Sequence, residues 1–174
     1  MKQQLDSSRT TWHITVGTYG TRLHGGVRPT VDRGHNARGE PFIDLDPERE
    51  GSARAKMRGD PVLLTSEQRV FVEAIVPTIC QRGGWKYRIC AAPGPPENTH
   101  VHVLCDADRF RHGKQIRLWL KRWLTKAMDA RWGRPTGGSW WVQDGSTKPV
   151  TDEAYLNNVY EYIQCQRTTI CMQD

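Results

Sequence analysis

The sequence lacks the patterns that mark membrane-bound and secreted proteins. No stretch approaches the roughly 20 apolar residues that a membrane-spanning helix needs. The first eleven residues are polar and charged, with neither an apolar signal segment nor an amphipathic transit helix. The five cysteines form an odd set without a C-x-x-C pair, which argues against a disulfide framework or a thiolate zinc site. We therefore expect a soluble, cytoplasmic protein with reduced thiols and no membrane partner.

Length and charge limit the number of domains and the class of binding partner, but they do not identify a function. The 174 residues allow one domain with a hydrophobic core and are too few for two ordinary domains. We expect a single domain over residues 1–174, with a long surface insertion at about 20–60, where Gly, Pro, Arg and Asp replace apolar residues. The net charge of +6 favours a polyanionic partner, although ribosomal and tRNA-binding proteins share it.

Apolar periodicity predicts an α+β fold. Alternating β-branched and aromatic residues indicate strands, and apolar residues at steps of three and four indicate helices. A capping box at Thr65 and Gln68 opens the first helix, which Pro77 should kink or shorten. The order β-α-β-β-α-β plus a final helix predicts a ferredoxin-like split βαβ with an antiparallel central sheet. The expected strands are 10–19, 85–91, 99–105 and 139–143, and the expected helices are 66–82, the segment around 116–128, and 151–166.

The triplet His100-Val101-His102 is the strongest chemical signal in the chain. Residues i and i+2 of a strand point to the same face, so both imidazoles can bind one metal ion. Val101, Val103 and Leu104 would supply the opposite, buried side. Two nitrogen ligands leave coordination positions open for a phosphate oxygen, as a catalytic metal requires. By itself the triplet also fits a solvated strand, and His13 and His112 are further ligand candidates.

The last predicted helix carries a candidate nucleophile. Tyr162 and Gln166 are one helical turn apart on one face, so a phenol and an amide oxygen can serve the same site. A phenolate can attack a phosphodiester and conserve the bond energy as phosphotyrosine, while Gln166 could be a third metal ligand. Tyr160 with Gln164 has the same spacing and is the alternative pair. Packing of the tyrosines against a core is the simpler interpretation.

Basic and aromatic residues suggest where nucleic acid could bind. Trp119 and Trp123 are expected in the core, whereas one of Trp140 and Trp141 should face outward and could stack on a base. Arginines of the insertion (Arg28, Arg33 and Arg38) could contact a hairpin. A basic stripe on the second helix, opposite its apolar face, could follow a phosphate backbone or could simply be solvated. With Trp141, the candidate DNA-binding residues are Lys114, Arg117, Lys121, Arg122 and Lys126.

Several motifs together resemble the HUH nucleases, and most closely the REP-associated tyrosine transposases. The most specific is Asn98-Thr-His-Val-His-Val103, and the resemblance spans nearly the whole chain. The other matching segments are Trp12-His-Ile-Thr-Val-Gly-Thr-Tyr19, Leu64-Thr-Ser-Glu-Gln68, Arg82-Gly-Gly-Trp85, Gly145-Ser-Thr147 and the terminal helix around Tyr162.

The resemblance implies an activity. It assigns His100, His102 and Gln166 to a divalent metal, Mg²⁺ or Mn²⁺, and Tyr162 to a covalent 5′-phosphotyrosine with single-stranded DNA. Hairpins at palindromic repeats would be the targets, in a bacterial, nucleoid-associated protein whose state as monomer or homodimer is left open. We therefore predict a DNA nicking and rejoining enzyme of the transposase type. The alternatives are another HUH nuclease, such as a replication or mobilisation relaxase, and a catalytically silent nucleic-acid-binding domain.

Overall fold

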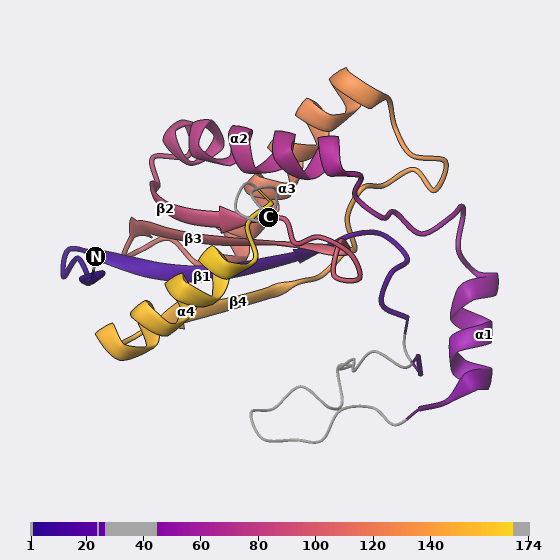
Figure 1. Cartoon of the computed structure of the whole chain (residues 1–174), viewed down its shortest axis with the longest axis horizontal. Coiled ribbons are helices and arrows are strands. Elements are labelled where there is room, and N and C mark those ends of the chain that lie inside the picture. The colour runs from indigo at the N-terminus through magenta and orange to yellow at the C-terminus, as the bar shows by residue number, and fades with distance from the viewer. Residues whose placement is uncertain (1, 24, 27–44, 169–174) are drawn as a thin grey trace.

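A four-stranded antiparallel sheet organises the chain (Figure 1). The structure is a computed structural model that describes residues 2–23, 25–26 and 45–168. Its strand order is β2-β3-β1-β4, the order of a ferredoxin-like split βαβ, so the predicted fold class is confirmed. The elements in chain order are β1 (Arg9–Gly17), α1 (Pro47–Ala55), α2 (Ser66–Arg82), β2 (Lys86–Ala91), β3 (His100–Asp108), α3 (Gly113–Trp132), β4 (Ser146–Val150) and α4 (Glu153–Cys165).

The fourth strand is not where the sequence predicted it. Residues 139–143 contribute only an isolated bridge between Thr18 and Trp141, whereas β4 is the following segment Ser-Thr-Lys-Pro-Val. Pro149 argued against a strand there, but β4 is the edge of the sheet, where a missing N–H is tolerated. The aromatic residues that made 139–143 look like a strand are buried in a loop instead.

Helix α2 has the predicted bounds, and its capping box forms. Thr65 Oγ1 accepts from Gln68 N at 3.2 Å, and Gln68 Oε1 accepts from Thr65 N at 2.9 Å. Pro77 was expected to kink or shorten the helix, and it does not shorten it. A proline removes the hydrogen bond to the carbonyl four residues earlier. Here that carbonyl, of Glu73, accepts a weak hydrogen bond from the Cys90 thiol at 3.6 Å instead.

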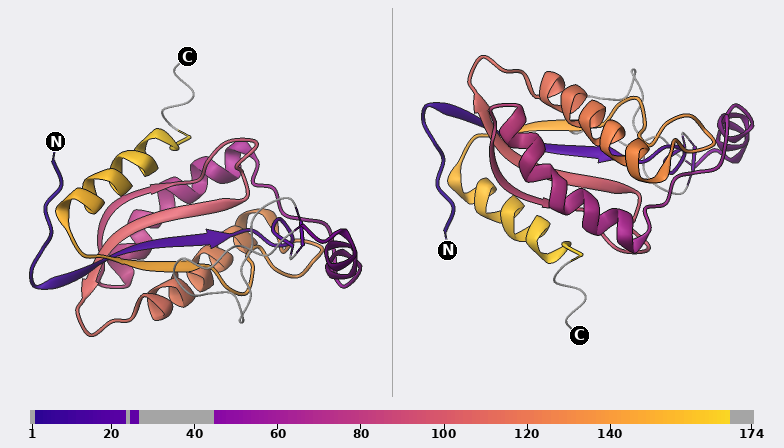
Figure 2. Two further views of the ribbon diagram at one scale, coloured as in Figure 1. Left: turned by 90° about the horizontal axis from the view of Figure 1, so that it is seen from below. Right: turned by 90° about the horizontal axis from the view of Figure 1, so that it is seen from above.

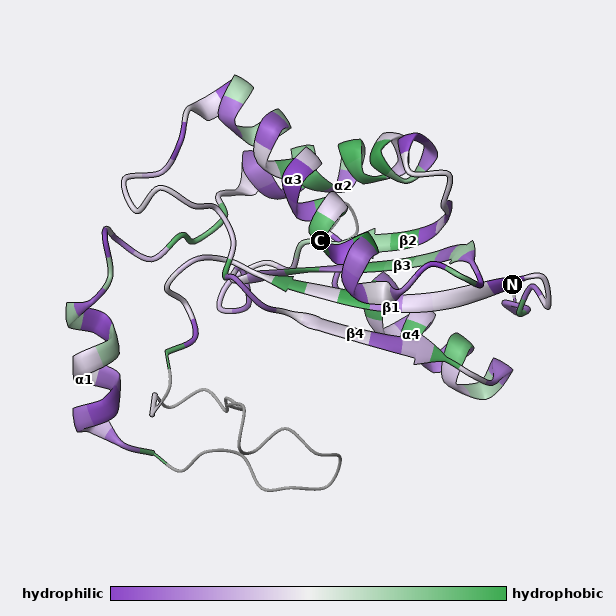
Figure 3. Cartoon of the chain, turned by 180° about the vertical axis from the view of Figure 1, so that it is seen from behind, coloured by the Kyte–Doolittle hydropathy of each residue, from purple (hydrophilic) through white to green (hydrophobic). Residues whose placement is uncertain are grey.

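The two faces of the sheet bury different side chains. Helices α2 and α3 cover one face and α4 covers the other (Figure 2). Hydrophobic residues are concentrated on the strands and on the helix faces directed toward them, whereas α1 is largely hydrophilic (Figure 3). Because side chains alternate along a strand, Val101 and Val103 of β3 join the core under α2 and α3. Leu104 belongs to the smaller core under α4, together with Leu156 and Ile163, and not to the valine side as predicted.

The predicted insertion contains a helix that the sequence analysis missed. Helix α1 has no buried residue, and Asp46 caps it by accepting from Arg49 N at 2.9 Å. Arg28, Arg33 and Arg38 lie outside the described residues. Four cysteines are described, and all four are free thiols, as predicted; Cys171 lies outside the described residues. None of the described helices combines the length and apolarity that a membrane crossing requires.

A buried ion pair anchors the far end of β3. Asp106 is fully buried, and its Oδ1 accepts from Arg88 Nε at 2.6 Å and from Thr11 Oγ1 at 2.7 Å. Arg88 also donates to Gln3 Oε1 at 3.2 Å and to the carbonyl of Gln4 at 2.8 Å. The pair therefore ties β1, β2 and β3 to the N-terminal segment that packs beside α4.

Removal of the Asp106 carboxylate should destabilise the fold. The Asp106→Ala variant leaves Arg88 buried without its partner, which we expect to cost about 3–5 kcal/mol in the free energy of unfolding. Asp108→Ala is the matched control, because Asp108 is exposed at the end of the same strand and its carboxylate accepts from Phe110 N. It should cost about 1 kcal/mol or less. Urea unfolding measures both, and equal losses would contradict the assigned role of the ion pair.

Candidate active site

The site begins on β3, where alternation places His100 and His102 on the face covered by α4. Both side chains are buried, at 4% and 6% exposed. Antiparallel pairing sets Thr15 of β1 opposite His102, and His13 follows on the same face two residues before Thr15. The solvated strand considered from the sequence is therefore wrong. The histidines are held on a central strand.

The two imidazoles point their Nε2 atoms at each other. The Nε2 atoms are 2.9 Å apart, and the rings are edge to face. Nδ1 of His102 lies 3.1 Å from both His13 Nε2 and Thr15 Oγ1, and Nδ1 of His100 lies 3.4 Å from Thr99 Oγ1. Polar partners at Nδ1 favour keeping the ring protons there. The Nε2 lone pairs then face a common point, where a shared ligand can bind.

This spacing suits neighbouring ligands of one metal ion. Two nitrogens bound at about 2.1 Å and at right angles to each other are separated by about 3 Å. Burial, with the adjacent His100 and His13 rings, holds the pKa of His102 well below its usual value. Burial also lowers the pKa of His13 to about 4. The rings of His102 and His13 are therefore neutral near pH 7, the form that a metal ligand must take.

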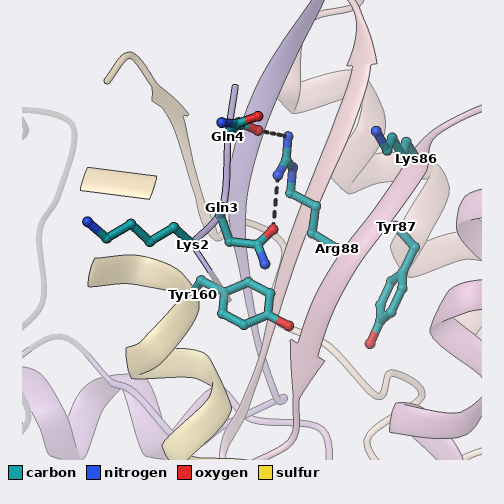
Figure 4. Close-up of a pocket in the computed structure, with 7 residues that line it drawn as sticks. All are labelled: Lys2, Gln3, Gln4, Lys86, Tyr87, Arg88 and Tyr160. Atoms are coloured by element: carbon teal, nitrogen blue, oxygen red, sulfur yellow. Dashed lines mark hydrogen bonds between the residues drawn. The ribbon is translucent and has the colours of Figure 1, made fainter. Parts of the chain in front are cut away.

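Tyr162 is the tyrosine of α4 that faces this pair. Its ring centroid is 5.4 Å from that of His102, in an edge-to-face arrangement, and its side chain is 49% exposed. Tyr160 points elsewhere. It lines a cavity of about 320 Å³ beside the N-terminal segment, where Figure 4 shows its phenol near Gln3, with Arg88 and Tyr87 on the neighbouring strand. Of the two candidate tyrosines, Tyr162 therefore lies beside the histidine pair and Tyr160 lines a different cavity.

Gln166 lies at the C-cap of α4. It lines the same cavity as Glu97, whose carboxylate is 3.8 Å from His100 Nδ1. The Oε1 atom of Gln166 is buried and has no hydrogen-bond partner among the described residues. Within the same residues, no group of three or more His, Cys, Asp and Glu side chains could hold a metal. The amide oxygen of Gln166 has the chemistry of a possible third protein ligand.

A buried carboxylate that the sequence analysis overlooked fixes the end of α4. Glu73 of α2 accepts from Ala92 N and from Thr168 N, both at 2.9 Å. Thr168 Oγ1 donates to the Ala92 carbonyl at 2.8 Å and accepts from Arg69 Nη1 at 2.9 Å. This Glu73 clamp joins the end of the tyrosine helix to the end of β2. Arg69 and Glu73 fall one turn apart on the buried face of α2, and charge at such positions was the signal available in the sequence.

The basic stripe on α3 is only partly as predicted. Lys114, Arg122 and Lys126 are exposed. Arg117 is 8% exposed and donates to the Gly145 carbonyl, and Lys121 donates to the Gln143 carbonyl at 2.7 Å. Both therefore hold α3 against the segment before β4, because their long stems reach back over the helix to unsatisfied carbonyls. The prediction of a solvent-facing stripe was wrong for Arg117, which is buried, whereas Lys121 is partly exposed.

The tryptophan predictions also need correction. Trp140 and Trp141 are both buried, at 4% and 3% exposed, so neither faces outward to stack on a base. Strand alternation does not apply to them because they lie in a loop, where Trp140 Nε1 donates to Asp129 Oδ1 at 2.9 Å. Trp119, expected in the core, is 41% exposed and packs its ring against Trp123, which is partly buried as expected.

Comparison with known proteins finds distant similarity among solved structures. No protein-family model matches the chain, and no curated protein matches it. Among solved structures, the chain is similar to a protein from Deinococcus radiodurans R1 that is provisionally described as a transposase. The two share 13% identity over 96% of this chain and 98% of the other, with a TM-score of 0.46. A likeness at this level establishes neither a family nor a function for the chain.

Proposed function

We propose that this protein is a divalent-metal-dependent enzyme that nicks and rejoins single-stranded DNA beside hairpins, of the transposase type. The observation that carries the proposal is the convergence of His100, His102 and Tyr162 on one face of the sheet. The Nε2 atoms are 2.9 Å apart, and the phenol ring lies 5.4 Å from His102. A metal-binding pair beside a solvent-accessible phenol matches the needs of phosphodiester transesterification.

His100 and His102, with Gln166 as a third ligand, would hold Mg²⁺ or Mn²⁺. The buried Oε1 of Gln166, which has no partner in the described part of the chain, supports this assignment, because an isolated buried acceptor is costly unless a ligand satisfies it. When bound, the ion polarises the scissile phosphate and offsets its negative charge. His13 and Thr15 orient the His102 ring through its Nδ1. The buried strand β3 holds His100 and His102 in fixed positions.

Tyr162 performs the covalent step. Its phenolic oxygen attacks the phosphorus, a new P–O bond forms to the tyrosine, and the bond from phosphorus to the 3′ oxygen breaks. The products are a 5′-phosphotyrosine and a free 3′ hydroxyl. The phenolic proton leaves to solvent, to which the half-exposed side chain is open, and the leaving 3′ oxygen takes up a proton from solvent. Attack by a 3′ hydroxyl on the phosphotyrosine reverses the step and rejoins a strand, so no nucleotide hydrolysis is needed.

The exposed cations of α3 could guide the DNA backbone. Lys114 and Arg122 are eight residues apart, and Arg122 and Lys126 are four residues apart. The three side chains therefore lie along one side of the helix. Phosphate contacts of this kind position a strand without reading its sequence. Arg117 and Lys121 act indirectly in this proposal, by holding α3 in place.

A denaturing gel tests the function directly. The protein is incubated with Mn²⁺ and single-stranded DNA that carries a hairpin with unpaired flanks, labelled at its 3′ end. We expect a protein–DNA adduct that survives denaturant and disappears when the metal is chelated. A related nuclease specialised for replication origins or mobilisation would need a different DNA. Binding without any adduct would support the alternative of a catalytically silent nucleic-acid-binding domain and would refute the enzyme proposal.

A further inference from the structure

A second cavity adjoins the proposed active site, and apart from Gln166 its lining residues have no role in the chemistry described above. It has a volume of about 430 Å³ and lies where the loop after β2 meets the end of α4. This size is within the range of pockets that bind small organic groups. We call it the proline pocket, after Pro93, Pro95 and Pro96; its other lining residues are Arg69, Gly94, Glu97, Cys165, Gln166 and Thr168.

A buried cation lines this pocket without full hydrogen bonding. Arg69 is 8% exposed, and its Nε has no hydrogen-bond partner among the described residues, although Nη1 is held by Thr168. Gly94 permits the close approach of the guanidinium, because a Cβ atom at that position would lie 3.2 Å from Nη1. A buried guanidinium with an unused donor is costly unless something else satisfies it. Because Arg69 also lines the pocket, its guanidinium borders whatever occupies it.

The chemistry of the pocket fits a flat, neutral heterocycle better than a phosphate. Three proline rings form an apolar wall on which an aromatic ring can pack, and the Arg69 guanidinium offers hydrogen-bond donors and cation–π attraction. Glu97, 48% exposed at the same pocket, would repel a phosphate but can accept from the amino or imino group of a base. The pocket therefore combines stacking surface, donor and acceptor.

We propose that the proline pocket binds one unpaired nucleobase of the strand that carries the scissile phosphate. The proposal rests on the function proposed above and names a substrate contact of that site. Its location supports it: Glu97 lies 3.8 Å from His100, and Gln166 lines the pocket, so an occupant lies next to the reacting phosphate. The occupant would hold a single strand in register, because a base that is paired in a duplex cannot enter a pocket.

Binding measurements with abasic DNA test this pocket separately from catalysis. Hairpin strands with one abasic site at each unpaired flanking position in turn are titrated in chelator, where no cleavage occurs. We expect one position at which loss of the base weakens binding about tenfold, the usual effect of losing one stacked base. The Cys165→Phe variant should abolish that sensitivity, because Cys165 is exposed and lines the pocket, so a bulky ring there fills it.

Gln164→Phe is the matched control. Gln164 is exposed on the same turn of α4 and does not line the pocket, so this variant should keep the full sensitivity to the abasic site. The proposal is overturned if no position is sensitive, or if Cys165→Phe loses as much affinity at the abasic position as the wild type does. It is also overturned if a neutral methylphosphonate linkage weakens binding at the pocket and an abasic site does not. Adduct formation on the intact strand, measured in parallel, shows whether the proposed enzyme function holds when the pocket proposal fails.

Discussion

The Tyr162→Phe variant is expected to lose covalent adduct formation by more than about a thousandfold, because no other group replaces an essential nucleophile. The substitution removes one hydroxyl and keeps the ring that packs near His102. Because the side chain is half exposed, the free energy of unfolding should change little. The labelled hairpin strand and a denaturing gel measure the adduct, and anisotropy in chelator should show unchanged binding of the strand.

Tyr160→Phe is the control for this prediction. It makes the same chemical change two residues earlier on α4, at a side chain that lines the cavity beside Gln3 and Arg88. Adduct formation by this variant should be close to that of the wild type. A Tyr162→Phe protein that still forms the adduct, or a Tyr160→Phe protein that does not, would show that the nucleophile is assigned to the wrong tyrosine.

Replacement of either histidine by alanine should remove the metal and the activity together. With one imidazole left, we expect Mn²⁺ affinity to fall more than about a hundredfold, above the 10- to 100-fold loss typical of a residue that only orients a ligand. Titration calorimetry or the Mn²⁺ electron paramagnetic resonance signal measures binding without reference to catalysis. Adduct formation should vanish in both His100→Ala and His102→Ala, while metal-free binding of the strand persists.

Variants of two further histidines, His112 and His13, serve as controls for that experiment. His112→Ala should behave as the wild type, because His112 is exposed before α3 and its side chain makes no capping hydrogen bond. His13→Ala should have an intermediate effect, because His13 touches Nδ1 of His102 and would only orient that ring. If His100→Ala and His102→Ala bind Mn²⁺ as tightly as His112→Ala does, the metal site is not at this pair.

The parts of the fold that were predictable are those that local patterns specify. Helix α2 was predicted from its capping box and apolar spacing, and its bounds agree with the structure. The pairing of His100 with His102 follows from strand alternation alone, and the structure confirms that they share a face. By contrast, β4 has neither apolar alternation nor an obvious boundary, because an edge strand with one covered face needs few apolar residues.

The parts of the site that were missed depend on contacts between distant segments. In the Glu73 clamp, Glu73 binds Ala92, 19 positions away, and Thr168, 95 positions away. No local spacing in the sequence predicts such contacts. Likewise, helical spacing alone could not select Tyr162 as the partner of His102, since Tyr160 has an equivalent neighbour in Gln164. The burial of Arg117 and the inward hydrogen bonds of Lys121 were missed for a related reason. Helical periodicity gives the direction of the Cα–Cβ bond, whereas a long side chain can return to carbonyls beside the core.

The residues of β4 protect the edge of the sheet against the addition of a strand from another molecule at high protein concentration. An edge strand offers unpaired N–H and carbonyl groups that can template the addition of another chain and so seed aggregation. Pro149 has no N–H to offer, and the exposed Lys148 beside it carries a charge that an incoming strand would have to desolvate. This border of the sheet therefore resists polymerisation, and the sequence of a five-residue strand supplies that protection.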